Sequence, residues 1–551
     1  MFDLMIRSGD VVTPEGVVRC DVAVAGERIA AIAAPGALSA ESAKHLIDAT
    51  GHIVMPGGID PHVHLHHEWI KPDGTPLVTA GPEQVGRAAL FGGTTTFIDF
   101  AYWRDGVSAL QAIETRNKDF VGKSPCDWAY HIMLHSEPPP EFAGELAEAI
   151  QAGYPTLKIF TTNILPSRSG RMVDFGDIWE AFQVLAKEGG LGVIHAEDND
   201  IVMHMYAKLI REGRVGYEHL AEVHNQLSED LSFRRILRLA ESVPGTALYM
   251  MHVSAGTGVA AIAEARRKGL PVYGETLHQY LIYSANDYKR PNGQIYHTYP
   301  SLKSEEDQKA LWQGTANDTI HCIATDELCC TLKDKTVGSR IDDTTGGNSG
   351  VEPRLGVMYT EMVARRGYSL SQYVDLVSSN AAKIMGLYPR KGAIAPKSDA
   401  DITILDPTRR GKVRAADLHE TDYTPWEGHD IFAWPVVTIL RGKVMVENGQ
   451  YLGSPRDGRY LKRKIAQKIR DGAALWARLT SIWLVSSWPK ASRPGTWPAL
   501  LSARAMAQSS SAERARKSAS TPHHRIRRFG GWSRSTAASV GRFRSWPFFV
   551  R

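Results

Sequence analysis

Two histidines one residue apart, His62 and His64, are the first group in the sequence that could do chemistry. They follow an apolar run at residues 53–55, after which two glycines break the pattern. In an extended strand, residues i and i+2 point to the same face, so both imidazoles could reach one metal ion beyond the strand end. A His-x-His pair alone also fits a structural role. The interpretation therefore depends on whether the rest of the chain supplies further ligands.

Further polar side chains occur in or after other strand-like segments. Lys158 lies inside an apolar run, and His195, His252 and Asp326 each follow one. A histidine at a strand end is often a packed rim residue, and an aspartate there often caps the next helix. A lysine in a buried strand is different, because desolvation disfavours its charge unless that charge is paired or removed.

Imidazole and carboxylate are ligands that suit zinc or similar divalent ions. A lysine whose amine has reacted with carbon dioxide becomes an anionic carbamate, which can bridge two metals and removes the buried cation. Two such metals would lower the pKa of bound water and polarise a carbonyl group. Asp326 could then accept a proton and pass it to a leaving amine. Together the six residues predict a two-metal hydrolytic site.

The elements that position these residues follow an alternating pattern. Strand-like segments are expected near Ile53 and at residues 94–99, 128–134, 156–160, 191–195, 247–253, 272–276 and 320–325. Helical patterns at 177–187, 232–241 and 259–268 fall between several of them, which predicts βαβ units and a parallel sheet. Eight units over about 340 residues match a TIM barrel, whose functional residues sit at the C-terminal ends of its strands. We therefore predict an α/β fold with a (β/α)8 TIM barrel.

Both ends of the chain carry β-strand patterns. They occur at residues 4–7, 10–12, 21–25 and 28–32, and again at 401–405 and 439–445. Two unrelated β segments are the alternative, but we favour a small β-sandwich domain formed by both ends of the chain. The expected domains are sandwich parts at 1–53 and 395–465, a metal-dependent hydrolase barrel at 54–394, and a tail at 466–551.

The tail differs in composition from the rest of the chain. From residue 471 it holds 14 Lys and Arg against 2 Asp and Glu, and six of the thirteen tryptophans. This composition predicts a basic, disordered tail, with a nucleic-acid-binding arm as the less favoured alternative. The first 470 residues hold 50 basic and 58 acidic residues, so the net charge of +4 comes from the tail. Because we find no transmembrane run, secretory signal or disulfide framework, we expect a cytoplasmic protein without a membrane partner.

The motifs resemble the amidohydrolase superfamily and, within it, the dihydropyrimidinase/hydantoinase family of cyclic amidases. The resemblance covers residues 1 to about 465 and rests on Gly-Gly-Ile-Asp60-Pro-His62-Val-His64, Leu157-Lys158-Ile-Phe, His195-Ala-Glu, His252-Val-Ser and Thr325-Asp326. It implies two Zn²⁺ ions per subunit. His62, His64 and Asp326 would hold one, His195 and His252 the other, and carboxylated Lys158 would bridge them. It also implies that Asp326 is the proton shuttle and that the chain forms a homo-oligomer, commonly a homotetramer.

The chain departs from the family pattern at two positions. Relatives usually place a tyrosine five residues after the bridging lysine, where it steadies the oxyanion, but this chain has Asn163. Losing one oxyanion donor typically costs about 3 kcal/mol, so we expect either the Asn163 amide or Tyr299 to replace it. Relatives usually place a histidine after the metal-binding aspartate, and here it is Glu327. Both changes are expected to affect the substrate pocket rather than the metals.

The resemblance implies a hydrolase that opens the ring of a hydantoin or dihydropyrimidine, a small-molecule cyclic amide, at its C–N bond. The same centre could act on another ring, such as allantoin, a cyclic imide or dihydroorotate. A deaminase would usually need one metal and no strand lysine. A non-catalytic dihydropyrimidinase-related scaffold would have lost metal ligands, whereas all six ligand positions are filled here.

Overall fold

A computed structural model of the protein describes residues 1–70, 74–104, 106–135, 138–168 and 170–475. Eight parallel strands form one sheet in the order β15-β14-β13-β12-β11-β10-β9-β6. They are β6 (Gly58–Asp60), β9 (Thr94–Trp103), β10 (Asp127–Leu134), β11 (Thr156–Phe160), β12 (Leu191–His195), β13 (Leu248–Met250), β14 (Val272–Leu277) and β15 (Ile320–Ala324). Nearly every residue of these strands is buried, because a parallel barrel strand is covered on both faces.

The sheet closes into a barrel between its first and last strands. Val63, just beyond β6, forms a parallel bridge with Glu327, just beyond β15. The fully buried Arg354 lies at the same seam and donates hydrogen bonds to the carbonyls of Ile59 (3.2 Å) and Ile323 (2.9 Å). The guanidinium of Arg354 thus links the backbones of β6 and β15 through hydrogen bonds. The predicted (β/α)8 barrel is confirmed.

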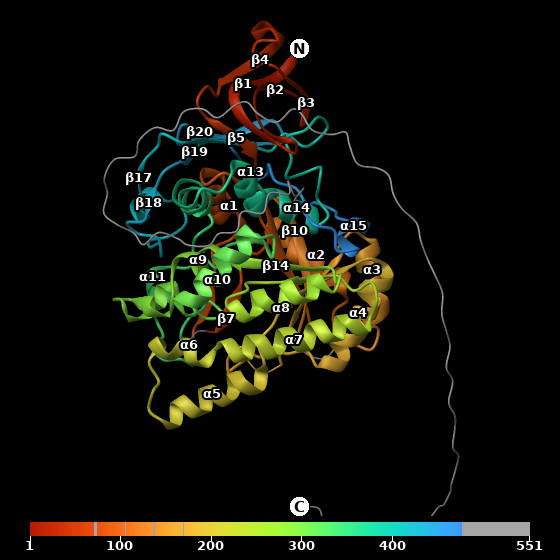
Figure 1. The fold of residues 1–551 in the computed structure, drawn as a ribbon, viewed down its shortest axis with the longest axis vertical. Helices are drawn as coiled ribbons and strands as arrows, with labels where there is room; N and C mark the ends of the chain where they lie inside the picture. The colour runs from red at the N-terminus through yellow and green to blue at the C-terminus, as the bar shows by residue number, and fades with distance from the viewer. Residues whose placement is uncertain (71–73, 105, 136–137, 169, 476–551) are drawn as a thin grey trace, which may run out of the picture. The chain divides into compact units, whose positions relative to one another are not determined.

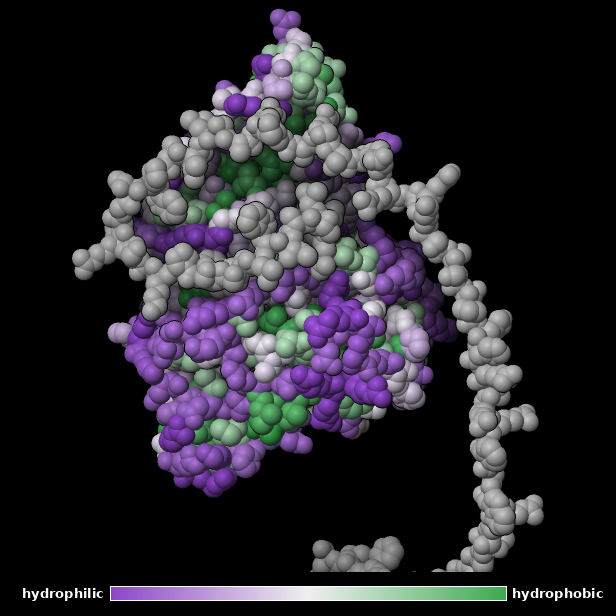
Figure 2. Space-filling model, in the orientation of Figure 1, coloured by the Kyte–Doolittle hydropathy of each residue, from purple (hydrophilic) through white to green (hydrophobic). Residues whose placement is uncertain are grey.

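Helices lie between the barrel strands in the chain and also follow the last of them. They are α1 (Pro82–Phe91), α2 (Ala109–Phe120), α3 (Phe142–Gln151), α4 (Phe175–Glu188), α5 (Asn199–Arg211), α6 (Leu220–Val223), α7 (Gln226–Ser242), α8 (Gly256–Arg267), α9 (His278–Ile282), α10 (Glu305–Ala316), α11 (Leu332–Lys335), α12 (Arg354–Tyr359), α13 (Leu370–Val374), α14 (Asn380–Ile384) and α15 (Gln467–Arg470). Two of the helical patterns predicted from the sequence, 177–187 and 232–241, lie within α4 and α7, and the third, 259–268, extends one residue past the end of α8. Hydrophilic residues predominate over α5, α7 and α8 in Figure 2, with apolar patches between them. No helix of the described ranges is long and apolar enough to cross a membrane.

Both ends of the chain build the second sheet. It runs β21-β20-β19-β16-β5-β1-β2-β3, and β4 pairs with β1. The strands are β1 (Phe2–Thr13), β2 (Gly16–Ala25), β3 (Arg28–Ala33), β4 (Ala43–Asp48), β5 (Ile53–Pro56), β16 (Ile402–Asp406), β19 (Trp434–Leu440), β20 (Lys443–Glu447) and β21 (Gln450–Tyr451). In Figure 1 the N-terminal strands, in red, lie next to β19 and β20, in blue. Apolar residues from both ends share a separate core, which confirms the β-sandwich formed by the two chain ends.

Two short hairpins complete the strands. They pair β7 (Glu68–Ile70) with β8 (Pro76–Val78), and β17 (Gly411–Lys412) with β18 (Asp430–Ile431).

Two sequence-based expectations differ from the structure. The strand expected near Ile53 belongs to the sandwich, since β5 pairs with β1 and β16, and the first barrel strand is β6. An apolar run of this length fits either sheet, so the sequence could not assign it. The expected tail at 466–551 also begins too early. Residues 467–470 form α15, Ile469 is buried, and its carbonyl accepts a hydrogen bond from Tyr273 (2.8 Å). Residues 476–551 lie outside the described ranges.

Candidate metal centre

His62, His64 and Asp326 converge at the C-terminal ends of β6 and β15. The Oδ1 atom of Asp326 lies 3.0 Å from His62 Nε2 and 3.2 Å from His64 Nε2, and the two Nε2 atoms are 3.3 Å apart. One possible ligand atom from each residue lies within 4.8 Å of the others, so the trio could hold a metal ion. Burial lowers the pKa of His64 to about 4, which keeps its imidazole neutral and able to bind a metal. The Oδ2 atom of Asp326 accepts a hydrogen bond from the Thr298 hydroxyl at 2.7 Å.

Lys158, His195 and His252 lie beside this trio. The rings of His195 and His252 are 4.5 Å apart, and those of His252 and His62 are 5.4 Å apart. Lys158 is almost fully buried on β11, with its ammonium group 2.8 Å from Met251 Sδ. Burial lowers the pKa of Lys158 to about 7. All six residues predicted as ligands line one pocket, together with His67, Phe160, Ile164, Arg168, Arg171, Thr298, Tyr299, Leu328, Gly346 and Gly347.

The buried carboxylate of Glu275 supports two of the histidines. It accepts hydrogen bonds from Tyr249 Oη at 2.8 Å and from the backbone N–H of His252 at 3.1 Å, and it lies 2.8 Å from His62 Nδ1. This contact leaves Nε2 of His62 to face Asp326. Burial disfavours the imidazolium of His62, but the carboxylates of Asp326 and Glu275 outweigh burial and raise its pKa to about 9.

A second carboxylate, Glu197, supports His195. It lies 2.9 Å from His195 Nε2 and 2.9 Å from His224 Nδ1, and the Nε2 atom of His224 contacts the hydroxyl of Tyr206. A metal at His195 would therefore use Nδ1. Burial disfavours the Glu197 carboxylate, but His224 and His195 outweigh it and hold the pKa of Glu197 below its usual value.

Glu275, Glu197 and His224 are not among the site residues predicted from the sequence. The sequence signal for Glu275 is the same as for Lys158, because each is a charged residue inside an apolar strand. Glu197 stands two residues after His195, within the His195-Ala-Glu motif that carries part of the family resemblance. For His224 we find no sequence signal, since it lies between helices and meets Glu197 only in the folded chain.

Backbone geometry at two strand ends is unusual. His252 has φ 36° and Asp326 has φ 54°, in the left-handed region that non-glycine residues rarely adopt. Such positions concentrate at functional sites, where surrounding contacts hold them in place. After His252, the buried Glu229 accepts the backbone N–H groups of Ser254 and Ala255, which fixes the chain leaving β13.

The two candidate oxyanion donors lie in different places. The side-chain oxygen of Asn163 accepts the backbone N–H groups of Arg171 and Met172, both at 3.0 Å, and Asn163 is not among the described residues that line the pocket. Tyr299 does line the pocket, and its hydroxyl donates to the carbonyl of Thr344 at 3.0 Å. Asn163 thus shapes the loop that follows β11, while Tyr299 reaches the pocket wall.

Glu327 differs from its expected place near the substrate. Its Oε2 atom accepts the backbone N–H groups of Gly350 (2.8 Å) and Val351 (2.9 Å), and it is absent from the described pocket wall. Burial raises the pKa of Glu327 well above its usual value. The residue after Asp326 therefore holds the following segment instead of touching the pocket.

Comparison with known proteins identifies relatives over most of the chain. The sequence profile of the Amidohydrolase family matches residues 53–445. A D-hydantoinase of Geobacillus stearothermophilus is 34% identical over 466 residues, which are 83% of this chain and 96% of that protein. The solved structure of a D-hydantoinase from Bacillus sp. AR9 matches with a TM-score of 0.79 at 33% identity, over 84% of this chain and 100% of that one. A dihydropyrimidinase from Brevibacillus agri NCHU1002 matches with a TM-score of 0.78 at 31% identity, over 84% and 99% of the two chains. The chain therefore belongs to the Amidohydrolase family and, within it, to the hydantoinase and dihydropyrimidinase group.

Proposed function

We propose that the protein is a two-metal cyclic amidohydrolase that opens the ring of a hydantoin or dihydropyrimidine by hydrolysing a cyclic amide C–N bond. The observation that carries this proposal is the convergence of His62, His64 and Asp326 on one point, in the pocket that also holds Lys158. Relatives named D-hydantoinase and dihydropyrimidinase share the fold over nearly their whole length.

The residues present fit the metals on which this family depends. His62, His64 and Asp326 would hold one Zn²⁺, and His195 and His252 the other, with neutral imidazoles and a carboxylate as zinc ligands. Zinc bound there would supply Lewis-acid polarisation of the amide carbonyl and a bound water of lowered pKa. Glu275 and Glu197 would orient His62 and His195, as carboxylates do for metal-binding histidines.

Lys158 would bridge the two metals as a carbamate. With a pKa of about 7, roughly half of the lysine carries a neutral amine at pH 7. The neutral amine attacks carbon dioxide, an N–C bond forms and one proton leaves. The product is an anionic oxygen ligand in place of a buried cation. No carboxylate of the described residues forms an ion pair with Lys158, which supports this change of charge.

Asp326 would move the proton. Its carboxylate faces the pocket, and the Thr298 hydroxyl fixes its orientation through Oδ2. In this position it would accept a proton from the attacking water and deliver it to the leaving ring nitrogen. Tyr299 is the better candidate for steadying the oxyanion, provided that its hydroxyl turns from the carbonyl of Thr344 toward the substrate. Asn163 would act indirectly, by holding the loop.

Ring opening of dihydrouracil, hydantoin and 5-phenylhydantoin by zinc-loaded protein tests the proposal. Lys158→Ala should lose ring-opening activity and part of the bound zinc, while Lys309→Ala, at an exposed position, should lose neither. Bound zinc without activity on these three compounds would favour another substrate, such as allantoin, a cyclic imide or dihydroorotate. Absence of bound zinc would instead favour a non-catalytic scaffold.

Two further parts of the proposal concern assembly and compartment. We propose a homo-oligomer, with a homotetramer expected from the family resemblance, which light scattering on purified protein would test. All five cysteines are unpaired and buried, which supports a reducing compartment such as the cytoplasm.

A further inference from the structure

Part of the pocket wall is strongly cationic. The loop after β11 brings Arg168 and Arg171 to the wall that also carries the proposed metal ligands. Arg171 and Lys158 both approach the ring of Phe160, with Cζ 5.0 Å and Nζ 4.8 Å from its centroid. Arg168 lies 5.9 Å from the ring centroid of Tyr299. Both guanidinium groups are therefore close to where a substrate would sit.

The surroundings of Arg171 differ from those of the buried Arg116. Arg116 forms ion pairs with Asp99 (2.7 Å) and Asp119 (3.0 Å). Within the ranges that the structure describes, no carboxylate forms an ion pair with Arg171, and its charged neighbours include Arg168 and Arg104. Burial lowers the pKa of Arg171 to about 9, and this value still leaves it charged at neutral pH. A partly buried cation with like charges beside it is stabilised when an anion enters the pocket.

We infer that the substrate carries an anionic group outside the ring, and that Arg171 binds this group, with Arg168 beside it. This inference rests on the proposed function, because it specifies the cyclic amide that the same pocket takes. The substrate class is then a hydantoin or dihydropyrimidine with a carboxylate substituent. The planar guanidinium matches a carboxylate with two parallel hydrogen bonds, which a neutral alkyl or aryl group cannot accept.

The test uses two compounds that differ in charge and hardly in size. They are racemic 5-(carboxymethyl)hydantoin and racemic 5-(carbamoylmethyl)hydantoin. For the zinc-loaded protein, kcat/KM and KM are measured for each compound that is turned over, and calorimetry gives Kd for each that is not. A charge-assisted pair should favour the acid by about 10- to 100-fold.

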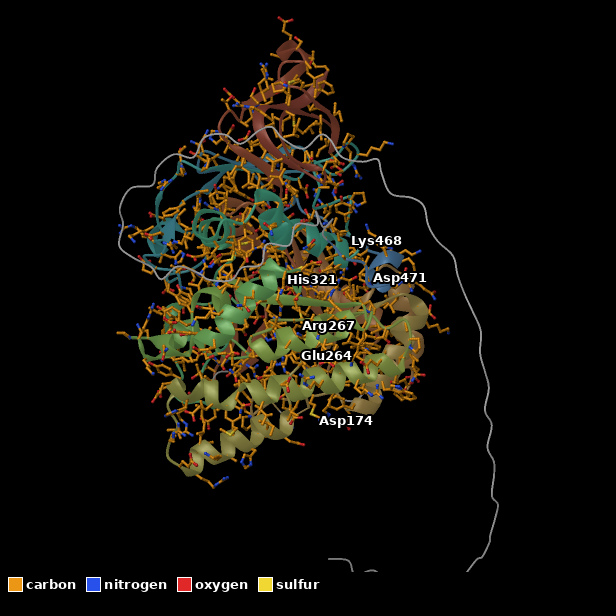
Figure 3. All side chains as sticks on the ribbon, viewed as in Figure 1. Asp174, Glu264, Arg267, His321, Lys468 and Asp471 are labelled. Carbon is orange, nitrogen blue, oxygen red and sulfur yellow. The ribbon has the colours of Figure 1, made fainter. Side chains whose placement is uncertain are left out.

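Three variants identify the group responsible. Arg171→Gln should bring the preference for the acid close to unity, mainly through KM or Kd. Arg171→Lys keeps the positive charge but loses the two parallel N–H donors of the guanidinium, so it should retain part of the preference for the acid. Arg267→Gln removes the same charge from an exposed position on α8 and should keep the whole preference (Figure 3). The thermal unfolding midpoint of each variant shows whether it folds.

The outcomes separate this inference from the proposed function. Equal binding of both compounds, or binding of neither, would overturn the inference. A preference that survives in folded Arg171→Gln would also overturn it, because another group would then hold the carboxylate. Ring opening of both compounds with equal kcat/KM would support the proposed function and overturn this inference. Preferential binding of the acid without ring opening would support the anion site and would count against the proposed function.

Discussion

Glu275→Gln should weaken metal binding although Glu275 itself is not a proposed ligand. The carboxylate is fully buried and lies 2.8 Å from His62 Nδ1, which fixes the ring so that Nε2 faces Asp326. Glutamine has nearly the same shape and can still accept from Nδ1–H through its oxygen. The substitution therefore removes the negative charge and leaves the packing almost intact.

The size of the effect follows from the contacts. A buried hydrogen bond to a charged group contributes about 1.5–3 kcal/mol, against about 1 kcal/mol for a neutral one. Loss of such an outer partner typically costs 10- to 100-fold in metal affinity, or about 1.4–2.7 kcal/mol. One of the two carboxylates that raise the pKa of His62 would also be gone. The pKa of His62 in the metal-free protein should fall accordingly.

Competition with a chromogenic zinc chelator measures the affinity in wild type and variant. Tyr249→Phe is the matched control, because it removes a hydrogen bond to the other oxygen of the same carboxylate and leaves the charge near His62. We expect Glu275→Gln to bind zinc 10- to 100-fold more weakly and Tyr249→Phe to change much less. Unchanged affinity in Glu275→Gln would refute the reasoning. Equal losses in both variants would show that core packing, rather than charge, is responsible.

Three further predictions concern the barrel seam, a buried acid and the metal ligands. Arg354→Met should lower the free energy of unfolding by about 3 kcal/mol or more, because it leaves carbonyls of β6 and β15 without their donor; an unchanged urea midpoint would contradict this. Burial raises the pKa of Glu229 from 4.5 to about 7, so its stabilising effect is full below about pH 4.5 and is lost as the pH rises through 7. Glu229→Gln should accordingly make the unfolding midpoint less dependent on pH between 5 and 8, and identical slopes would argue against it. Because the pKa of His62 is about 9, zinc uptake at pH 7.5 should release about one proton from it. Calorimetry in two buffers of different ionisation enthalpy would detect this proton, and equal heats would contradict it.

Much of the fold could be predicted from the sequence because its signals are local. The alternation of apolar strands with helical patterns predicts the parallel barrel, and seven of its eight strands lie where that pattern placed them. The prediction of a barrel strand near Ile53 is wrong, because a short apolar run does not show which neighbour it pairs with. Pairing partners such as β1 and β16 are distant in the chain, and only the folded protein brings them together.

The site divides in a similar way. The sequence by itself determined which residues could bind metal, because imidazole and carboxylate side chains at strand ends must meet at one face of a parallel barrel. Only the tertiary structure determined which residues orient these side chains and which other residues line the pocket. Glu275 meets His62 across 213 residues of chain, and Asn163 turns toward the loop backbone instead of the pocket. Arg171 reaches the pocket wall because that loop folds back. Strand periodicity fixes the face on which a side chain emerges, whereas contacts between distant segments and loop hydrogen bonds fix what it touches.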